Sequence, residues 1–205
     1  MNIETIVVGP FEVNCFILYN KEKKGIIIDP GYNTELISKK IKQNDITLIA
    51  CLITHGHVDH ICALGDIVEL FSIENIYMNN KDIQWAFSEE NSIPPYYSAP
   101  RKPKVPFKNL VEGTTIKIEE ISIETIETPG HSPGSVCFYM PAQKTIFTGD
   151  TLFKDGIGRT DLPGSDPKAM GNSLKKLAKL PPDTKVMPGH GEFTTIKDEL
   201  SYLNY

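Results

Sequence analysis

Length, composition and charge describe an ordinary globular protein. The chain has 205 residues, of which 40% are hydrophobic and 23% charged, so we predict a single domain over residues 1–205 and exclude a disordered chain. Its formal net charge of -5 at pH 7 argues against nucleic acid as a partner, because phosphate binding needs clustered Lys and Arg.

The first third of the chain is predicted to open a β-sheet. Three segments rich in Ile, Val and Phe are separated by turn residues, which is typical of an antiparallel meander, and they lie at 3–8, 13–19 and 25–29. Residues 33–43 have the apolar spacing of an amphipathic helix, with Asn33 or Thr34 as its N-cap. A fully apolar strand follows at 47–53 and stops at Thr54.

The middle of the chain contains an irregular segment, "NSIPPYYSAPRKPKVPF", at 91–107. Its prolines are incompatible with a long helix or a central strand. Two interpretations remain open. The segment is either a lid beside a functional site or a crossover between the two half-domains, since long loops need not be functional.

The second half is predicted to repeat the pattern of strand and helix. Strands are expected at 121–127, 134–140, 143–148 and 184–187, and a helix near 166–180. Three of these strands run into polar residues, in "IETIETPGH" to His131, "KTIFTGD" to Asp150 and "TKVMPGH" to His190. With the strand before Thr54, four strands deliver His or Asp to loops at their carboxyl ends, where open sheets usually build their sites.

The cysteines and the N-terminus indicate a reducing compartment. Four cysteines occur singly in apolar surroundings without C-x-x-C spacing, so we expect buried, reduced thiols and no disulfide; they are Cys15, Cys51, Cys62 and Cys137. The first residues, "MNIETIVVGPF", lack the parts of a signal peptide, and no apolar run approaches a membrane span. We therefore expect a cytoplasmic protein without a membrane partner.

All five histidines of the chain fall in the four loops at the strand ends, three of them in "THGHVDH". The alternative, in which they cap turns and complete core hydrogen bonds, leaves this clustering unexplained. Residues two apart in an extended segment point the same way, so His55 and His57 can hold one ion while Asp59 and His60 turn toward a second. Imidazole and carboxylate ligands suit Zn, Fe or Mn, and a carboxylate such as Asp150 can bridge two cations.

The motifs "THGHVDH", "PGHSPGS", "GDTLF" and "PGHGE" resemble, in their order, those of the metallo-β-lactamase superfamily. "NCFIL", "IIIDPG" and "GDTLFKDGIGRTDLPGS" resemble its glyoxalase II-like branch, the hydroxyacylglutathione hydrolases. The resemblance implies an αββα sandwich of two mixed β-sheets flanked by helices, with the metals at one sheet edge. Glyoxalase II carries a further helical domain that supplies part of its glutathione site. This chain ends soon after Gly191, so we expect a member without that domain.

The resemblance also implies a ligand set for two divalent metal ions, which we expect to be zinc, with iron or manganese as alternatives. His55, His57 and His131 would hold the first ion, and Asp59, His60 and His190 the second. Asp150 would bridge them. In true lactamases a cysteine occupies the position of Asp150 and the position of His60 is not histidine, so the resemblance disfavours a β-lactam hydrolase.

Two further residues have predicted roles around this metal site. Asp29 ends a buried strand at a Pro-Gly turn, and the resemblance implies that it also holds the His55 loop by hydrogen bonds. Arg159 stands where the family places a basic residue near the substrate, and its guanidinium can pair with a carboxylate. Alternatively, Arg159 fixes its own loop through Asp161.

The inferred site predicts hydrolysis of the thioester of an S-acyl small thiol, similar to S-lactoylglutathione, by a hydroxide generated on the metals. Asp59 or Asp150 would take up a proton as the intermediate collapses. Two alternatives belong to other classes. One is a persulfide dioxygenase with a mononuclear Fe(II) held by the counterparts of His55, His131 and Asp150. The other is a non-catalytic metal-binding module. The oligomeric state is not predicted.

Overall fold

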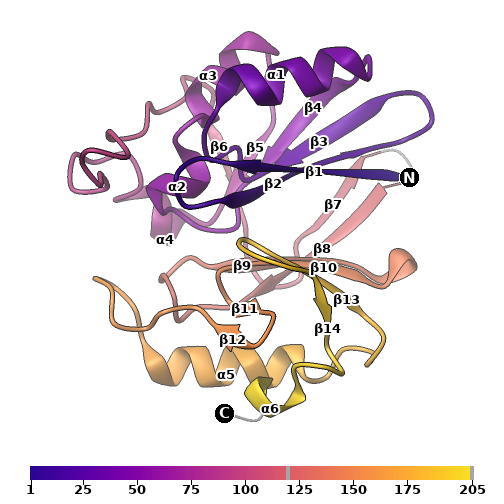
Figure 1. Cartoon of the computed structure of the whole chain (residues 1–205), viewed down its shortest axis with the longest axis vertical. Coiled ribbons are helices and arrows are strands. Elements are labelled where there is room, and N and C mark those ends of the chain that lie inside the picture. Colours follow the sequence, from indigo (N-terminus) through magenta and orange to yellow (C-terminus); the bar gives the residue numbers. More distant parts are fainter. Residues whose placement is uncertain (119–120, 204–205) are drawn as a thin grey trace. The chain divides into compact units, whose positions relative to one another are not determined.

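The computed structural model describes residues 1–118 and 121–203, which fall into two compact units that divide after residue 109 (Figure 1). Each unit contains its own six-stranded mixed β-sheet with helices. That the whole chain folds as a single domain stays a prediction. In the described part of the chain, every helix is too short or too polar to cross a bilayer.

The sheet of the first unit begins as the predicted meander. Its order is β1-β2-β3-β4-β5-β6, with antiparallel pairing from β1 to β3 and parallel pairing from β3 to β6. The strands are β1 Asn2–Val8, β2 Val13–Tyr19, β3 Lys24–Ile28, β4 Thr47–Leu52, β5 Ile76–Met78 and β6 Phe107–Asn109. All seven residues of β2 are buried, so both faces of this strand are covered.

The described residues of this unit include four helices. They are α1 Thr34–Gln43, α2 Val58–Ile61, α3 Leu64–Leu70 and α4 Asn80–Ile83. Figure 1 shows α1 and α3 side by side over the strands, and Ile37 and Ile41 of α1 pack in one cluster with Leu64 and Ile67 of α3. Asn33 is the N-cap residue of α1, as predicted, but its side chain does not make the expected capping hydrogen bond. The Asn33 side chain caps no helical N–H, because its oxygen accepts from the backbone N–H of Gly9 at 2.8 Å.

The proline-rich segment 91–107 lies within the first unit. It leads from the region after α4 into β6, and β6 pairs in parallel with β5. A crossover is therefore present, but it joins strands of one sheet, and the predicted crossover between half-domains is wrong. Parallel neighbours require such a long connection. A bridge between Ile93 and Tyr97 closes a turn inside it.

The sheet of the second unit has the order β14-β13-β10-β9-β8-β7. β10 and β13 pair in parallel, and the other described pairs are antiparallel. Its strands are β7 Thr115–Ile118, β8 Ile121–Glu127, β9 Val136–Met140, β10 Thr145–Gly149, β13 Lys185–Pro188 and β14 Thr194–Thr195. A short hairpin of β11 Leu152–Phe153 and β12 Gly156–Ile157 follows β10. The four strands predicted in this half are confirmed within one or two residues at either end.

Helix α5, Pro167–Leu177, covers this second sheet together with the short α6, Leu200–Leu203 (Figure 1). The carboxylate of Asp166 accepts from the N–H groups of Lys168 and Ala169 at 2.8 and 3.1 Å, a cap that contributes about 1 kcal/mol to helix stability. Leu174 and Leu177 pack with strand residues in one buried cluster. The helix predicted near 166–180 is thus confirmed, although it ends a few residues earlier.

All four cysteines are free thiols, and the predicted burial is confirmed for Cys15, Cys51 and Cys137 but not for Cys62. Burial raises the pKa of Cys15 and Cys51 well above the usual value, and that of Cys137 to about 12. Cys62 is half-buried, and its pKa is raised by burial and by nearby Asp66. These thiols therefore stay protonated at neutral pH, which suits a packing role.

Candidate metal centre

The first unit contributes one loop rich in potential ligands. β4 ends at Leu52, and the chain then presents His55 and His57 before α2, which carries Asp59 and His60. His55 and His60 are almost fully buried, with 1% and 0% exposure. The ligand atoms of His55 lie within 4.8 Å of those of both His57 and His60, and the Nε2 of His60 is 3.9 Å from a carboxylate oxygen of Asp59. Four donors therefore gather at the carboxyl end of β4.

Asp29 orients two of these histidines. It directly follows β3, and one of its carboxylate oxygens accepts from the N–H of Thr54 at 2.8 Å. The other accepts from the Thr54 hydroxyl at 2.6 Å and from the Nδ1 of His60 at 3.0 Å. Since the Thr54 hydroxyl gives its proton to Asp29, its oxygen accepts from the Nδ1 of His55 at 3.1 Å. Both rings thus carry their proton on Nδ1, which leaves Nε2 as the ligand atom.

The second unit brings three ligand residues together. His131 follows β8, Asp150 directly follows β10, and His190 follows β13. β10 and β13 run in parallel, and the N–H of Gly189 donates to the carbonyl of Gly149 at 2.8 Å, which holds the two loops side by side. The Nε2 atoms of His131 and His190 each lie 3.5 Å from the same Asp150 oxygen, Oδ2.

This spacing suits a shared metal ligand better than a hydrogen bond. Two ligands about 2.1 Å from one tetrahedral ion are about 3.4 Å apart. Asp150 Oδ2 has that separation, 3.5 Å, from two different imidazoles. The Nδ1 of His131 donates to the carbonyl of Arg159 at 2.9 Å, so Nε2 is again the ligand atom. The residues of this unit therefore fit a carboxylate that contacts metal ions on both sides.

The loop after β12 contacts Asp150 and His131 through Gly158 and the carbonyl of Arg159. Gly158 lies directly against Asp150, where a Cβ would come within 1.7 Å of the Asp150 carbonyl oxygen, so a side chain cannot be accommodated. The next residue, Arg159, is exposed and donates to both carboxylate oxygens of Asp161 at 2.9 Å. This is the loop-fixing arrangement considered from the sequence. A role of Arg159 in substrate binding stays a prediction.

Comparison with known proteins identifies the family. The model of the metallo-beta-lactamase superfamily matches residues 8–190. The chain belongs to the metallo-β-lactamase superfamily. Its predicted fold is thereby confirmed: this superfamily member has the mixed sheets and flanking helices of the metallo-β-lactamase fold, and it shares that fold with solved structures at TM-scores up to 0.91.

Three relatives of this superfamily member carry more specific names. The hydroxyacylglutathione hydrolase GloC of Haemophilus influenzae is 36% identical, over 97% of this chain and 95% of GloC. The structure of BLEG-1, a B3 metallo-β-lactamase, is 33% identical, with a TM-score of 0.91 over 100% of both chains. TTHA1623, solved in a di-iron-bound form, is 34% identical, with a TM-score of 0.84 over 96% of both chains.

Sequence reasoning found the ligand-type residues but missed part of their surroundings. The sequence marks Thr54 only as the residue that follows a strand, although its hydroxyl links Asp29 to His55. The ring of Trp85 lies 5.3 Å from that of His57, and the sequence predicts no role for Trp85. Neither contact leaves a signal in the sequence, because Asp29 lies 25 residues before Thr54 and Trp85 also lies far along the chain from His57.

Proposed function

We propose that this superfamily member is a metal-dependent hydrolase that cleaves the thioester of an S-acyl small thiol similar to S-lactoylglutathione. The observation that carries the proposal is the set of oriented His and Asp donors at the strand ends of each unit. The identity of 36% to a hydroxyacylglutathione hydrolase along nearly the whole chain favours a thioester over other acyl substrates.

We propose that the donors of both units form one centre for two divalent ions. His55, His57 and His131 would hold the first ion, Asp59, His60 and His190 the second, and Asp150 both. When bound, the ions would lower the pKa of a water toward neutrality and polarise the thioester carbonyl. The equal distances from Asp150 Oδ2 to His131 and His190 support the bridging role of Asp150.

The chain's own residues would hold the metal ligands in place and transfer a proton to the leaving sulfur. In hydrolysis a new C–O bond forms, the C–S bond breaks, and the thiolate leaves with the electron pair. The buried network of Asp29, Thr54 and His60 keeps the imidazole rings fixed during these steps. We assign proton uptake to a carboxylate oxygen of Asp59 or Asp150, which lie among the ligands and would pass the proton to the departing sulfur.

Imidazole and carboxylate donors suit zinc, iron and manganese alike. We propose zinc, because it supplies the Lewis acidity that hydrolysis uses and has no redox chemistry of its own. Iron remains the alternative, and the di-iron form of TTHA1623 gives a specific reason to test it.

Two other functions follow from particular observations. The persulfide dioxygenase predicted as an alternative needs only His55, His131 and Asp150, all of which are present. β-Lactam hydrolysis, disfavoured by the sequence argument, is retained because BLEG-1 is similar to this chain over its entire length. A metal-binding module without activity is the third alternative.

One set of assays separates these functions. The wild-type protein, loaded with zinc or with iron, is expected to release free thiol from S-lactoylglutathione in both forms. It should consume no oxygen with glutathione persulfide and leave a cephalosporin intact. Oxygen uptake by the iron form without thiol release would identify a dioxygenase, and cephalosporin turnover without thiol release would identify a lactamase. Inactivity of the loaded protein in every assay would favour the binding module.

A further inference from the structure

Gly56 separates the two proposed ligands His55 and His57, and side chains from segment 82–91 hold the peptide groups around it. The N–H of Gly56 donates to a carboxylate oxygen of Asp82 at 2.9 Å. The carbonyl of Gly56 accepts from the amide of Asn91 at 2.8 Å. Three consecutive peptide groups are fixed in this way, because the N–H of Val58 also donates to the Asn91 side-chain oxygen, at 3.1 Å.

Packing reinforces these hydrogen bonds. A Cβ placed on Gly56 would lie 3.1 Å from atoms of Asp82, Trp85 and Ala86, so the glycine rests closely on this segment. The Trp85 ring adds a contact with the ring of His57. The backbone between the two histidines is therefore fixed in two ways. Atoms of Asp82, Trp85 and Ala86 pack against Gly56, and hydrogen bonds hold both its N–H and its carbonyl.

The two holding residues are buried and are themselves anchored. Asp82 is 0% exposed and lies in α4, whose first turn is capped by the side chain of Asn79. Asn91 is 8% exposed, and its amide also donates to the carbonyl of Ala86 at 2.6 Å, which ties the segment to itself. Buried polar side chains of this kind are costly to fold unless their hydrogen bonds are made.

We propose that Asp82 and Asn91 are positioning residues for the metal centre, which hold His55 and His57 at the spacing that the first ion requires. This inference rests on the proposed metal site. A glycine between two ligands gives the loop many conformations, and fixing its peptide groups in advance removes that entropic cost from metal binding. Outer-shell partners of metal ligands typically change affinity by about 10- to 100-fold.

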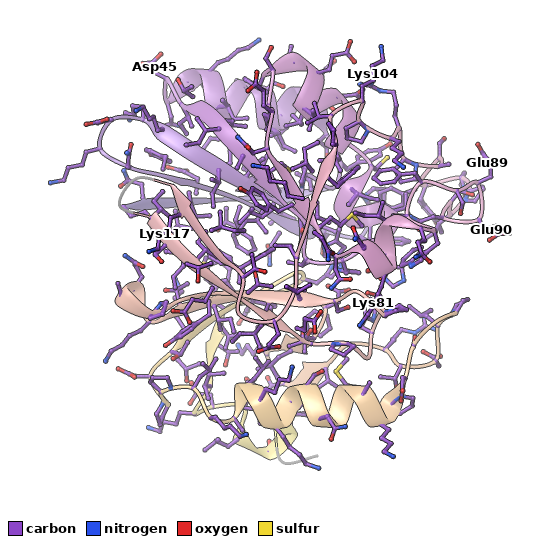
Figure 2. All side chains as sticks on the ribbon, turned by 180° about the vertical axis from the view of Figure 1, so that it is seen from behind. Asp45, Lys81, Glu89, Glu90, Lys104 and Lys117 are labelled. Carbon is purple, nitrogen blue, oxygen red and sulfur yellow. The ribbon has the colours of Figure 1, made fainter. Side chains whose placement is uncertain are left out.

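Zinc affinity tests the proposal directly. Metal-free protein is titrated with Zn²⁺ in competition with a chromophoric chelator. Asp82→Ala and Asn91→Ala should each weaken the binding of one ion by about 10- to 100-fold and leave the other within about twofold. Asp82→Asn should retain most of the affinity, because its amide oxygen can still accept from Gly56. Lys81→Ala and Glu90→Ala are matched controls. Both residues are exposed, as labelled in Figure 2, and the two hydrogen bonds to Gly56 come from Asp82 and Asn91 instead.

A second readout follows the loop itself. In the metal-free variants, the amide proton of Gly56 in Asp82→Ala and that of Val58 in Asn91→Ala should exchange with solvent at least about tenfold faster than in the wild type, because each loses its buried acceptor. If the alanine variants fail to fold, Asn91→Asp replaces them. It keeps the acceptor for Val58 but loses the donor to Gly56, so zinc binding should still weaken.

The outcomes separate this inference from the proposed function. Wild-type affinity for both ions in the alanine variants, or in Asn91→Asp, would overturn the positioning role while leaving the metal centre in place. Unchanged exchange at Gly56 and Val58 would also overturn it. Failure of the wild-type protein to bind zinc would instead refute the proposed metal centre.

Discussion

Asp59→Ala is expected to remove one of the two ions and to lower the rate of thiol release from S-lactoylglutathione by about a hundredfold or more. Asp59 is 8% exposed, and its carboxylate lies 3.9 Å from the Nε2 of His60. Removing it takes away both a proposed ligand to the second ion and one of the two proposed proton acceptors. His190→Ala should produce a similar loss through the same ion.

The measurement combines thiol release with metal content of the same sample. Glu89→Ala is the control, because this acidic side chain is exposed and projects away from the chain in Figure 2. In a mononuclear dioxygenase, Asp59 would be dispensable. Iron-loaded Asp59→Ala that still consumes oxygen with glutathione persulfide at nearly the wild-type rate would show that the hydrolase proposal is wrong.

Asp29→Ala is expected to lower the free energy of unfolding of the metal-free protein by roughly 2–5 kcal/mol. The Asp29 carboxylate is buried, at 1% exposure, and accepts from two groups of Thr54 and one of His60. Its removal leaves buried donors without an acceptor and releases the rings of His55 and His60. We therefore expect weaker binding of both ions in addition to the loss of stability.

Urea unfolding of metal-free protein measures the stability, with Asp45→Ala as the matched control. Asp29 and Asp45 both have left-handed backbones, with φ of 49° and 54°, so alanine brings similar backbone strain to each position. Asp45 is exposed, labelled in Figure 2, and its loss should cost much less. Equal destabilisation of the two variants would mean that the hydrogen bonds of Asp29 contribute little.

The sequence predicted best the features that depend on local pattern. Alternating or continuous apolar residues predicted the strands that end before His55, His131, Asp150 and His190. β8 buries alternate residues at its start, and β4, β10 and β13 are mostly buried. The histidines then marked where function should lie. The family resemblance supplied the fold, which neither periodicity nor composition can specify.

Features that depend on distant partners escaped prediction. β5, β6 and β14 have three, three and two residues, too few for a periodic signal, and they exist because neighbouring strands pair with them. Asn33 is a residue type that commonly caps helices, yet its side-chain oxygen accepts from the backbone N–H of Gly9 in another turn. Asp82 and Asn91 lie 26 and 35 residues from Gly56, so no local pattern links them.

In the proposed function, one chain binds two metal ions through its His and Asp ligands. Elemental analysis of protein purified without chelator and supplied with zinc measures the number of bound ions. We predict close to two ions per chain. A content of one ion or none after supplementation would contradict the dinuclear centre.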